Sequence, residues 1–122
     1  MNEKTRNILS WVLVGVLGVV FIGSAINKFV ASEETVKMAA NFGISANTFQ
    51  AIGVVELLAF VLFVIPRTGI IGTLLLAAYM GGAIATHLEH NEPFVAQAVI
   101  EAFVWIVAAI RFPELTNRLV GK

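Results

Sequence analysis

Cysteine is absent from the 122-residue sequence, and so is aspartate. Without cysteine, the chain by itself forms no disulfide, ligates no iron–sulfur cluster and offers no thiol for catalysis. Charged residues are also scarce: they make up 13% of the chain, whereas soluble domains average about a quarter. The formal net charge is zero, which gives no basis for nucleic acid binding. Hydrophobic residues dominate at 58%, and this composition indicates a membrane protein of one domain, residues 1–122.

Four long apolar stretches predict four membrane-spanning helices, at about residues 8–29, 49–65, 69–87 and 95–112. Each lies in the range of about 17–25 residues that crosses the hydrocarbon as a helix. Strands are not expected, because the runs are long and do not alternate between apolar and polar residues. The first run exceeds the usual apolar core of a signal peptide, which favours an uncleaved helix. We therefore expect an all-α fold, an antiparallel bundle of four transmembrane helices.

The connections between these helices predict their order. The turn "PRTG" (66–69) is so short that the second and third helices must be antiparallel neighbours. The longest connection contains "SEETVKMAANFG", in which Ser32 is a candidate N-cap and Gly43 a candidate C-cap. We therefore expect a short surface helix between the first and second spans. Met38 and Phe42 are placed to rest that helix on the mouth of the bundle.

The distribution of lysine and arginine predicts the orientation. Six of these residues lie on the side shared by both termini: Lys4, Arg6, Arg67, Arg111, Arg118 and Lys122. Only Lys28 and Lys37 lie on the other side. By the positive-inside rule, both termini are expected in the cytoplasm. Arg67 and Arg111, near the inner helix ends, are expected to extend toward the cytoplasmic headgroups.

Polar side chains gather in the outer half of the expected helices. Residues three or four apart share one face of a helix, and this spacing groups the candidates Lys28, Glu56, Tyr79, His87, Gln97, Glu101 and Trp105 on inward faces. An ionised carboxylate at membrane depth is costly unless it is paired or hydrated. We therefore expect a polar cleft, open to the outside, in which Lys28 pairs with Glu56 and His87 pairs with Glu101.

Small residues recur along the third helix. Gly81, Gly82 and Ala85 belong to repeats at spacing four, which allow close helix packing within the chain or between copies in a homo-oligomer. The Gly81–Gly82 pair is also a place where a span can be interrupted, as happens in transporters.

The motif "HLEH" (87–90) leaves several interpretations open. His87 and His90, together with Glu56 or Glu101, would give three ligands for a metal ion. The following Asn91 and Pro93 favour loops, however, and indicate a hydrated helix end. We expect no metal site, with His87 pointing into the cleft and His90 toward water. Haem is favoured even less, because both histidines lie on one helix end.

Several segments together resemble the DoxX-like family. They are "GSAINKF" (23–29), "GVVELL" (53–58), "IPRT" (65–68), "AYMGGAIATH" (78–87) and "IEAFVWI" (100–106). The resemblance runs from about residue 10 to 112 and implies a four-span protein of the bacterial inner membrane. The wider family is linked to quinone-reducing sulfur oxidation and to membrane-bound oxidoreductase complexes. By the same resemblance, Lys28, Glu56 and His87 match the family's characteristic polar positions.

Three functions follow as expectations, and the sequence does not decide whether the chain is an enzyme. The first is a small membrane subunit or assembly partner of a redox or stress-related complex, in which the polar cluster fixes helix register. The second is a quinone-binding oxidoreductase subunit, which would need a redox protein partner because no electron-carrying cofactor can be recognised in the chain. The third is a small-molecule or proton transporter acting as an oligomer.

Overall fold

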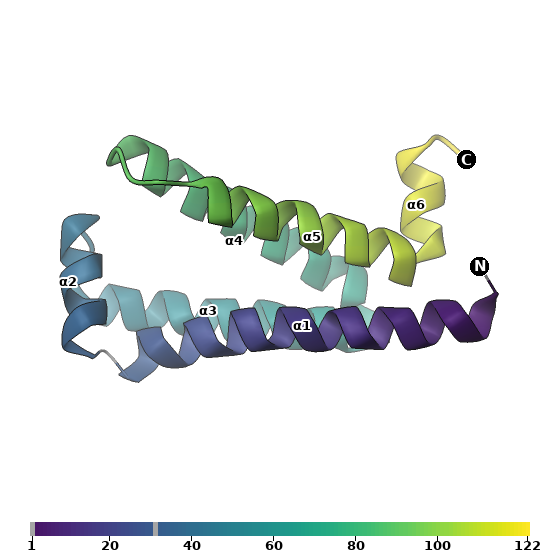
Figure 1. Ribbon diagram of the computed structural model, residues 1–122, viewed down its shortest axis with the longest axis horizontal. Helices are drawn as coiled ribbons and strands as arrows, with labels where there is room; N and C mark the ends of the chain where they lie inside the picture. The colour runs from purple at the N-terminus through teal and green to yellow at the C-terminus, as the bar shows by residue number, and fades with distance from the viewer. Residues whose placement is uncertain (1, 31) are drawn as a thin grey trace.

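The computed structural model describes residues 2–30 and 32–122. These residues form helices and turns and contain no strand, which confirms the all-α prediction. The elements are α1 (Glu3–Val30), α2 (Glu33–Asn41), α3 (Ala46–Val64), the 3₁₀ turn η1 (Pro66–Thr68), α4 (Gly69–Glu89), α5 (Val95–Arg111) and α6 (Pro113–Leu119). Around the bundle, α1 contacts α3, α3 contacts α4, α4 contacts α5, and α5 returns to α1. Both chain termini lie at one end (Figure 1), called here the terminal end, and α2 lies at the other, the α2 end.

Not every long helix has full spanning length. Within the described ranges, α1, α3, and α4 with its preceding turn are long and apolar enough to cross a membrane. Helix α5 has 17 residues, or about 26 Å at 1.5 Å per residue, against a hydrocarbon core of about 30 Å. It meets α6 at a bend of 110°. By length and composition, three helices in the described residues could therefore cross a membrane, or up to four if the bent pair counts as one.

The expected surface helix is present as α2. The Ser32 side chain accepts a hydrogen bond from the Thr35 amide and caps its N-terminus. After the helix, Gly43 has a φ of 70°, a left-handed conformation that glycine adopts without steric cost. Met38 and Phe42 line the cavity described below, so the prediction that they rest on the mouth of the bundle is confirmed.

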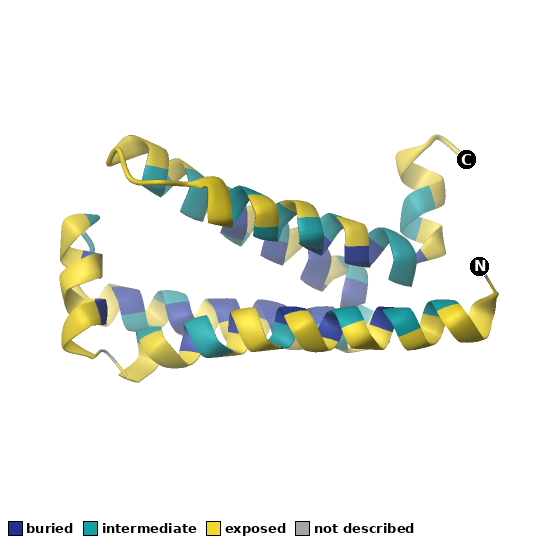
Figure 2. Cartoon of the chain, viewed as in Figure 1, coloured by how far each residue is buried: buried dark blue, intermediate teal, exposed yellow. Residues whose placement is uncertain are grey.

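Apolar side chains close the half of the bundle next to the terminal end. Leu17 of α1, Phe63 of α3, Leu76 of α4 and Val107 of α5 are each fully buried. Figure 2 shows buried residues on the facing sides of the helices and exposed residues on the outer sides. Toward the α2 end, α4 and α5 incline away from α1 and α3 (Figure 1). The packed half therefore holds the helices together, and the other half is more open.

The closest helix approaches occur at glycines other than the predicted ones. A Cβ added to Gly72 would lie 2.1 Å from the Phe63 amide nitrogen, so α4 contacts the α3 backbone there. At Gly53, a Cβ would lie 2.9 Å from the Lys28 Cβ, which brings α1 and α3 together. At Gly81 and Gly82 a Cβ would meet no atom within 4 Å. Within the chain these two residues make no tight packing contact, and their role between copies stays a prediction.

Arg111, which was expected to extend toward the cytoplasmic headgroups, bonds to the end of a neighbouring helix. Its guanidinium donates hydrogen bonds to the backbone carbonyls of Phe63 and Val64. These carbonyls belong to the last turn of α3, where they lack partners within the helix. The guanidinium carbon also lies 4.8 Å from the ring centroid of Trp11 and 5.0 Å from that of Phe112. Arg111 therefore caps the C-terminal end of α3.

Candidate functional site

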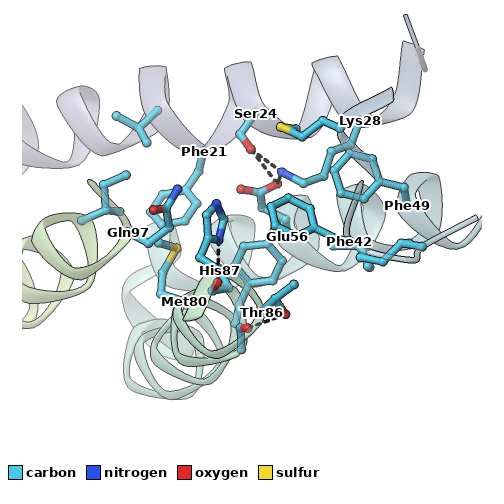
Figure 3. A pocket seen from close by; sticks show the side chains of 18 of the residues that line it. Phe21, Ser24, Lys28, Phe42, Phe49, Glu56, Met80, Thr86, His87 and Gln97 are labelled. Atoms are coloured by element: carbon cyan, nitrogen blue, oxygen red, sulfur yellow. Dashed lines mark hydrogen bonds and ion pairs between the residues drawn. The ribbon is translucent and has the colours of Figure 1, made fainter. Parts of the chain in front are cut away.

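A cavity of about 520 Å³ lies between the helices in the half next to the α2 end. It is lined by residues of α1, α3, α4 and α5, by Met38 of α2 and by Phe42, which follows α2. Phe21 and Phe49 contribute aromatic walls (Figure 3). Most of the lining is apolar, and the polar groups come from separate helices. This combination is typical of small-molecule sites in proteins.

The predicted ion pair between Lys28 and Glu56 is confirmed. Lys28 Nζ lies 3.1 Å from Glu56 Oε1, and the glutamate is only 2% exposed. The Ser24 hydroxyl donates to the same carboxylate oxygen at 3.2 Å and accepts a hydrogen bond from Lys28 (Figure 3). Ser24 and Lys28 are four residues apart on one face of α1, and Gly53 lets that face approach α3. The buried carboxylate is therefore neutralised and hydrogen-bonded within the chain.

His87 points into the cavity and His90 is exposed, as the sequence predicts. His87 Nδ1 lies 2.7 Å from the backbone carbonyl oxygen of Ala83. A carbonyl only accepts hydrogen bonds, so His87 Nδ1 is the donor of this one. The Phe42 ring packs against both imidazoles, with centroids 4.8 Å from His87 and 5.6 Å from His90. This contact holds the α2 segment over the end of α4.

Gln97 reaches the cavity from α5. Its Oε1 atom is buried and has no hydrogen-bond partner among the described residues. A buried acceptor without a partner costs about 1–3 kcal/mol. Tyr79 also lines the cavity, with its ring centroid 5.9 Å from Lys28 Nζ. The site thus brings together five of the predicted residues: Lys28, Glu56, Tyr79, His87 and Gln97.

Two predicted residues lie outside this group. Glu101 and Trp105 are half-buried on α5 but do not line the cavity. No hydrogen bond or ion pair joins Glu101 to His87 in residues 2–30 and 32–122, so the second expected pair does not form. The physical reason is local: the imidazole bonds to the carbonyl four residues earlier in its own helix. Glu101 also lies one helical turn beyond Gln97, farther from the α2 end.

Phe21 and Phe49 were not predicted as walls of the site, although the sequence carries a signal for them. Phe21 precedes Ser24 by three residues and Lys28 by seven, and Phe49 precedes Glu56 by seven. Spacings of three, four and seven place residues on a common helix face. Extending each polar face by one or two turns would have found both rings.

The sequence matches the DoxX-like family over residues 12–111. This chain belongs to the DoxX-like family. No curated protein and no solved structure gives a match. Family membership and the apolar helices together indicate a membrane protein.

In this DoxX-like protein, the described residues contain no group of three histidine, cysteine, aspartate or glutamate side chains that could hold a metal ion. His90 is exposed, and Glu101 does not reach His87. The site instead offers an internally paired lysine and carboxylate, an imidazole, an amide and aromatic surfaces. These groups suit hydrogen bonding to a flat, mostly apolar ligand with polar substituents.

Proposed function

We propose that this DoxX-like protein is a small membrane subunit of a redox assembly and that its cavity binds the head group of a quinone. The observation that carries the proposal is the cavity, with its apolar lining and its polar groups from four helices. Its volume of about 520 Å³ falls within the range of about 300–1,000 Å³ found for small-molecule sites. A quinone is lipid-soluble and can reach such a site from the bilayer.

The residues present fit a ring that carries two oxygens. Phe21, Phe42 and Phe49 supply aromatic surfaces for its faces. An ammonium group has three N–H donors, and Lys28 uses two of them on Ser24 and Glu56, so one remains for a ligand oxygen. His87 and Gln97 supply polar atoms on α4 and α5. When bound, a quinone would supply two-electron redox chemistry that the side chains of this chain lack.

A partner protein follows from the same composition. The chain has no cysteine, and its described residues contain no metal-ligand cluster. Electrons exchanged with a bound quinone must therefore pass to or from another protein that carries flavin, haem or metal. We accordingly propose a subunit role rather than a complete oxidoreductase.

The distribution of basic residues supports a proposal for the side of the membrane on which the cavity lies. Lys28 and Lys37 belong to the α2 end, and the other six basic residues belong to the segments at the terminal end. On the positive-inside rule, we propose that the terminal end lies in the cytoplasm and that the cavity opens on the outer side of a bacterial inner membrane. A partner would meet the cavity from that outer side or from within the membrane.

An assembly subunit without ligand chemistry is the second candidate. The specific observation in its favour is that Lys28, Ser24 and Glu56 satisfy one another without a ligand. Such a buried polar group can fix helix register. The Oε1 atom of Gln97 is closed off from the cavity as well as from solvent, so it does not distinguish the two candidates.

Transport by one chain finds no support in the described residues. Helix α4 runs unbroken from Gly69 to Glu89 through Gly81 and Gly82. The half of the bundle next to the terminal end is closed by buried apolar side chains. Transport would therefore require a path between the copies of an oligomer.

Two adjacent glycines provide a test of quinone binding. Gly82 lines the cavity and Gly81 does not, although both have free space around a Cβ. In Gly82→Leu the new side chain should fill the cavity, and Gly81→Leu is the matched control. The purified protein is heated in detergent with decylubiquinone in its oxidised or reduced form. A ligand at 100 times its Kd stabilises a protein by about 2.7 kcal/mol.

We expect the unfolding midpoint to rise with ligand in the wild type and in Gly81→Leu, and to stay unchanged in Gly82→Leu. Organic extraction of the protein from native membranes, followed by mass spectrometry, should also yield quinone. A midpoint that moves with neither redox form in the wild type would refute the proposal. Equal shifts in both glycine variants would place any bound quinone outside the cavity.

A further inference from the structure

Ala78 of α4 belongs both to the lining of the cavity and to the outer face of the bundle. It follows Leu74 by four residues and Ile71 by seven, spacings that place the three on one face of the helix. Ile71 is 57% and Leu74 55% exposed, and Ala78 is exposed as well. Gly82, the next residue at spacing four, is also exposed and also lines the cavity. The cavity therefore reaches the outer surface of the molecule along this edge of α4.

This edge of α4 is the one next to α3. Gly72 touches the α3 backbone at Phe63, and Tyr79 and Thr86, seven and fourteen residues later, continue the same face. Both of them line the cavity, and Ile52 lines it from α3. Toward the α2 end, α4 inclines away from α3 (Figure 1). The two helices therefore touch at Gly72 and leave a lateral opening of the cavity farther along.

The opening lies at the depth of the hydrocarbon. Ala78 is nine residues from Gly69 and eleven from Glu89, the two ends of α4, or about 14 and 17 Å along the axis. Helix α4 with its preceding turn is one of the helices that could cross a membrane. Space is free at its border, because a Cβ added to Gly82 would meet no atom within 4 Å. In a membrane, acyl chains rather than water therefore meet the cavity here.

The other sides of the cavity suit a hydrocarbon chain less well. Beside Lys28 the cavity adjoins a second hollow of about 540 Å³ between α1 and the α2 segment, and Ser24 and Lys28 line both. The second hollow adds four polar residues to these two: Asn27, Ser32, Glu34 and Thr35. At the α2 end, the Phe42 ring packs against His87 and His90. A chain leaving the cavity therefore meets polar groups or a packed ring on these sides, and lipid between α3 and α4.

We infer that the hydrocarbon chain of the ligand leaves the cavity between α3 and α4, past Ala78 and Gly82, and lies in the bilayer while the ring stays inside. This inference rests on the proposed quinone site. It narrows the ligand to an amphiphile, a ring with polar substituents that carries an apolar chain. It also gives these two small residues a role that helix packing within the chain does not, because larger side chains would close the opening.

The test compares decylubiquinone with its chainless analogue, in which a hydrogen replaces the decyl chain. Both are titrated by calorimetry into the purified full-length protein at one detergent concentration, and each variant is compared with the wild type, so that partitioning into detergent cancels. In Ala78→Phe we expect the affinity for decylubiquinone to fall about tenfold, because the new side chain occupies space that the decyl chain needs. The affinity for the chainless analogue should change less than about twofold, since its ring lies deeper in the cavity.

A second variant and two controls assign the effect to the opening. Ile52→Trp narrows the opening from α3 and should act in the same direction, which keeps the inference testable if Ala78→Phe does not fold. Ala85→Phe is the matched control on α4, because Ala85 is exposed, lies seven residues after Ala78 and does not line the cavity. Val55→Trp is the control on α3, where Val55 is exposed and outside the lining. The controls should leave both affinities unchanged.

The outcomes separate this inference from the proposal it rests on. A loss confined to decylubiquinone, in Ala78→Phe and Ile52→Trp but in neither control, supports the opening. If decylubiquinone binds these variants as it binds the wild type, or if both ligands weaken together, the inference is overturned and the quinone site is left standing. The same loss in Ala85→Phe would also overturn it, because the cavity would then not be involved. If neither ligand binds the wild type, the proposed function fails and the inference fails with it.

Discussion

Glu56 places a carboxylate in an apolar surrounding, where the residue is only 2% exposed. Its oxygen Oε1 accepts from the Ser24 hydroxyl and from the Lys28 ammonium. Removing one member of a buried ion pair typically costs about 3–5 kcal/mol, since the remaining charge stays buried without compensation. The contribution of this ion pair to the free energy of unfolding is therefore best measured by substituting Lys28 and Glu56 separately and together.

We expect Lys28→Met to lower the free energy of unfolding by about 3 kcal/mol, because the carboxylate then loses its counter-charge. Glu56→Gln should lower it by a similar amount, since the ammonium is left unpaired. The double variant should lose less than the sum of the two, because no isolated charge remains. The measurement is detergent-based unfolding followed by circular dichroism.

The exposed pair of Lys37 and Glu33 is the control for this cycle. Its charged atoms are 3.9 Å apart, and its side chains are 76% and 89% exposed. Exposed pairs of this kind contribute about 0–1 kcal/mol, so Lys37→Met should change stability little. A Lys28→Met effect no larger than that of Lys37→Met would show that the buried pair does not hold α1 against α3.

Residue-level reasoning from the sequence succeeded for Lys28 and Glu56 and failed for His87 and Glu101. A carboxylate at membrane depth needs a counter-charge, and Lys28 was the cation with matching depth, so few alternatives existed. An imidazole is satisfied by many acceptors, and His87 takes the Ala83 carbonyl at 2.7 Å, four residues earlier in its own helix. Such local competition with the backbone depends on the side-chain conformation, which the sequence does not specify.

At the scale of elements, α3 and α4 touch through glycine. A Cβ on Gly72 would lie 2.1 Å from the Phe63 nitrogen and 2.4 Å from its Cα, and backbone atoms cannot move aside without shifting a helix. Overpacking of this kind typically costs about 1–3 kcal/mol. We expect Gly72→Ala to lower the unfolding free energy by about 2–3 kcal/mol, again measured by unfolding in detergent.

Gly81→Ala is the matched substitution, nine residues farther along the same helix. A Cβ there meets no atom within 4 Å, and alanine favours the helix over glycine by up to about 1 kcal/mol. The variant should be as stable as the wild type or more so. If Gly81→Ala destabilises the protein as much as Gly72→Ala does, the small-residue stripe packs against a second copy, and its dissociation should then depend on protein concentration.

The sequence predicted the bounds of the helices well, but it predicted poorly which side of a helix faces its neighbour. Apolar runs and flanking prolines located α1, α3, α4 and α5 to within a few residues, apart from the N-terminal extension of α1, because hydrophobic length is a property of the chain itself. In α4, however, apolar residues surround the whole helix, so no stripe indicates which side faces α3. For this reason Gly72 was overlooked, and Gly81 and Gly82 were assigned to packing.

For the molecule as a whole, the cavity lies where α4 and α5 incline away from α1 and α3 (Figure 1), and Met38 and Phe42 are among its lining residues. Helix tilt is set by packing between helices and by interfacial anchors, not by span length. The sequence could therefore predict a cleft at that end from the positions of its polar residues, but not its volume or its aromatic walls. The volume and the walls depend on how the helices pack at the buried residues Leu17 and Phe63 and on the contact of Phe42 with His87.

The fold also makes a topological prediction that the lack of native cysteine renders simple to test. Ala40 is exposed on α2, and Asn117 is exposed on α6 at the opposite end. Neither substitution to cysteine changes the charge distribution that sets orientation. In intact cells, a membrane-impermeant maleimide should label Ala40→Cys and leave Asn117→Cys unlabelled until the membrane is permeabilised. Labelling of Asn117→Cys alone would invert the orientation and place the cavity on the cytoplasmic side, where a quinone partner would have to be cytoplasmic. Labelling of both in intact cells would mean that the two ends of the bundle do not face opposite sides of the membrane.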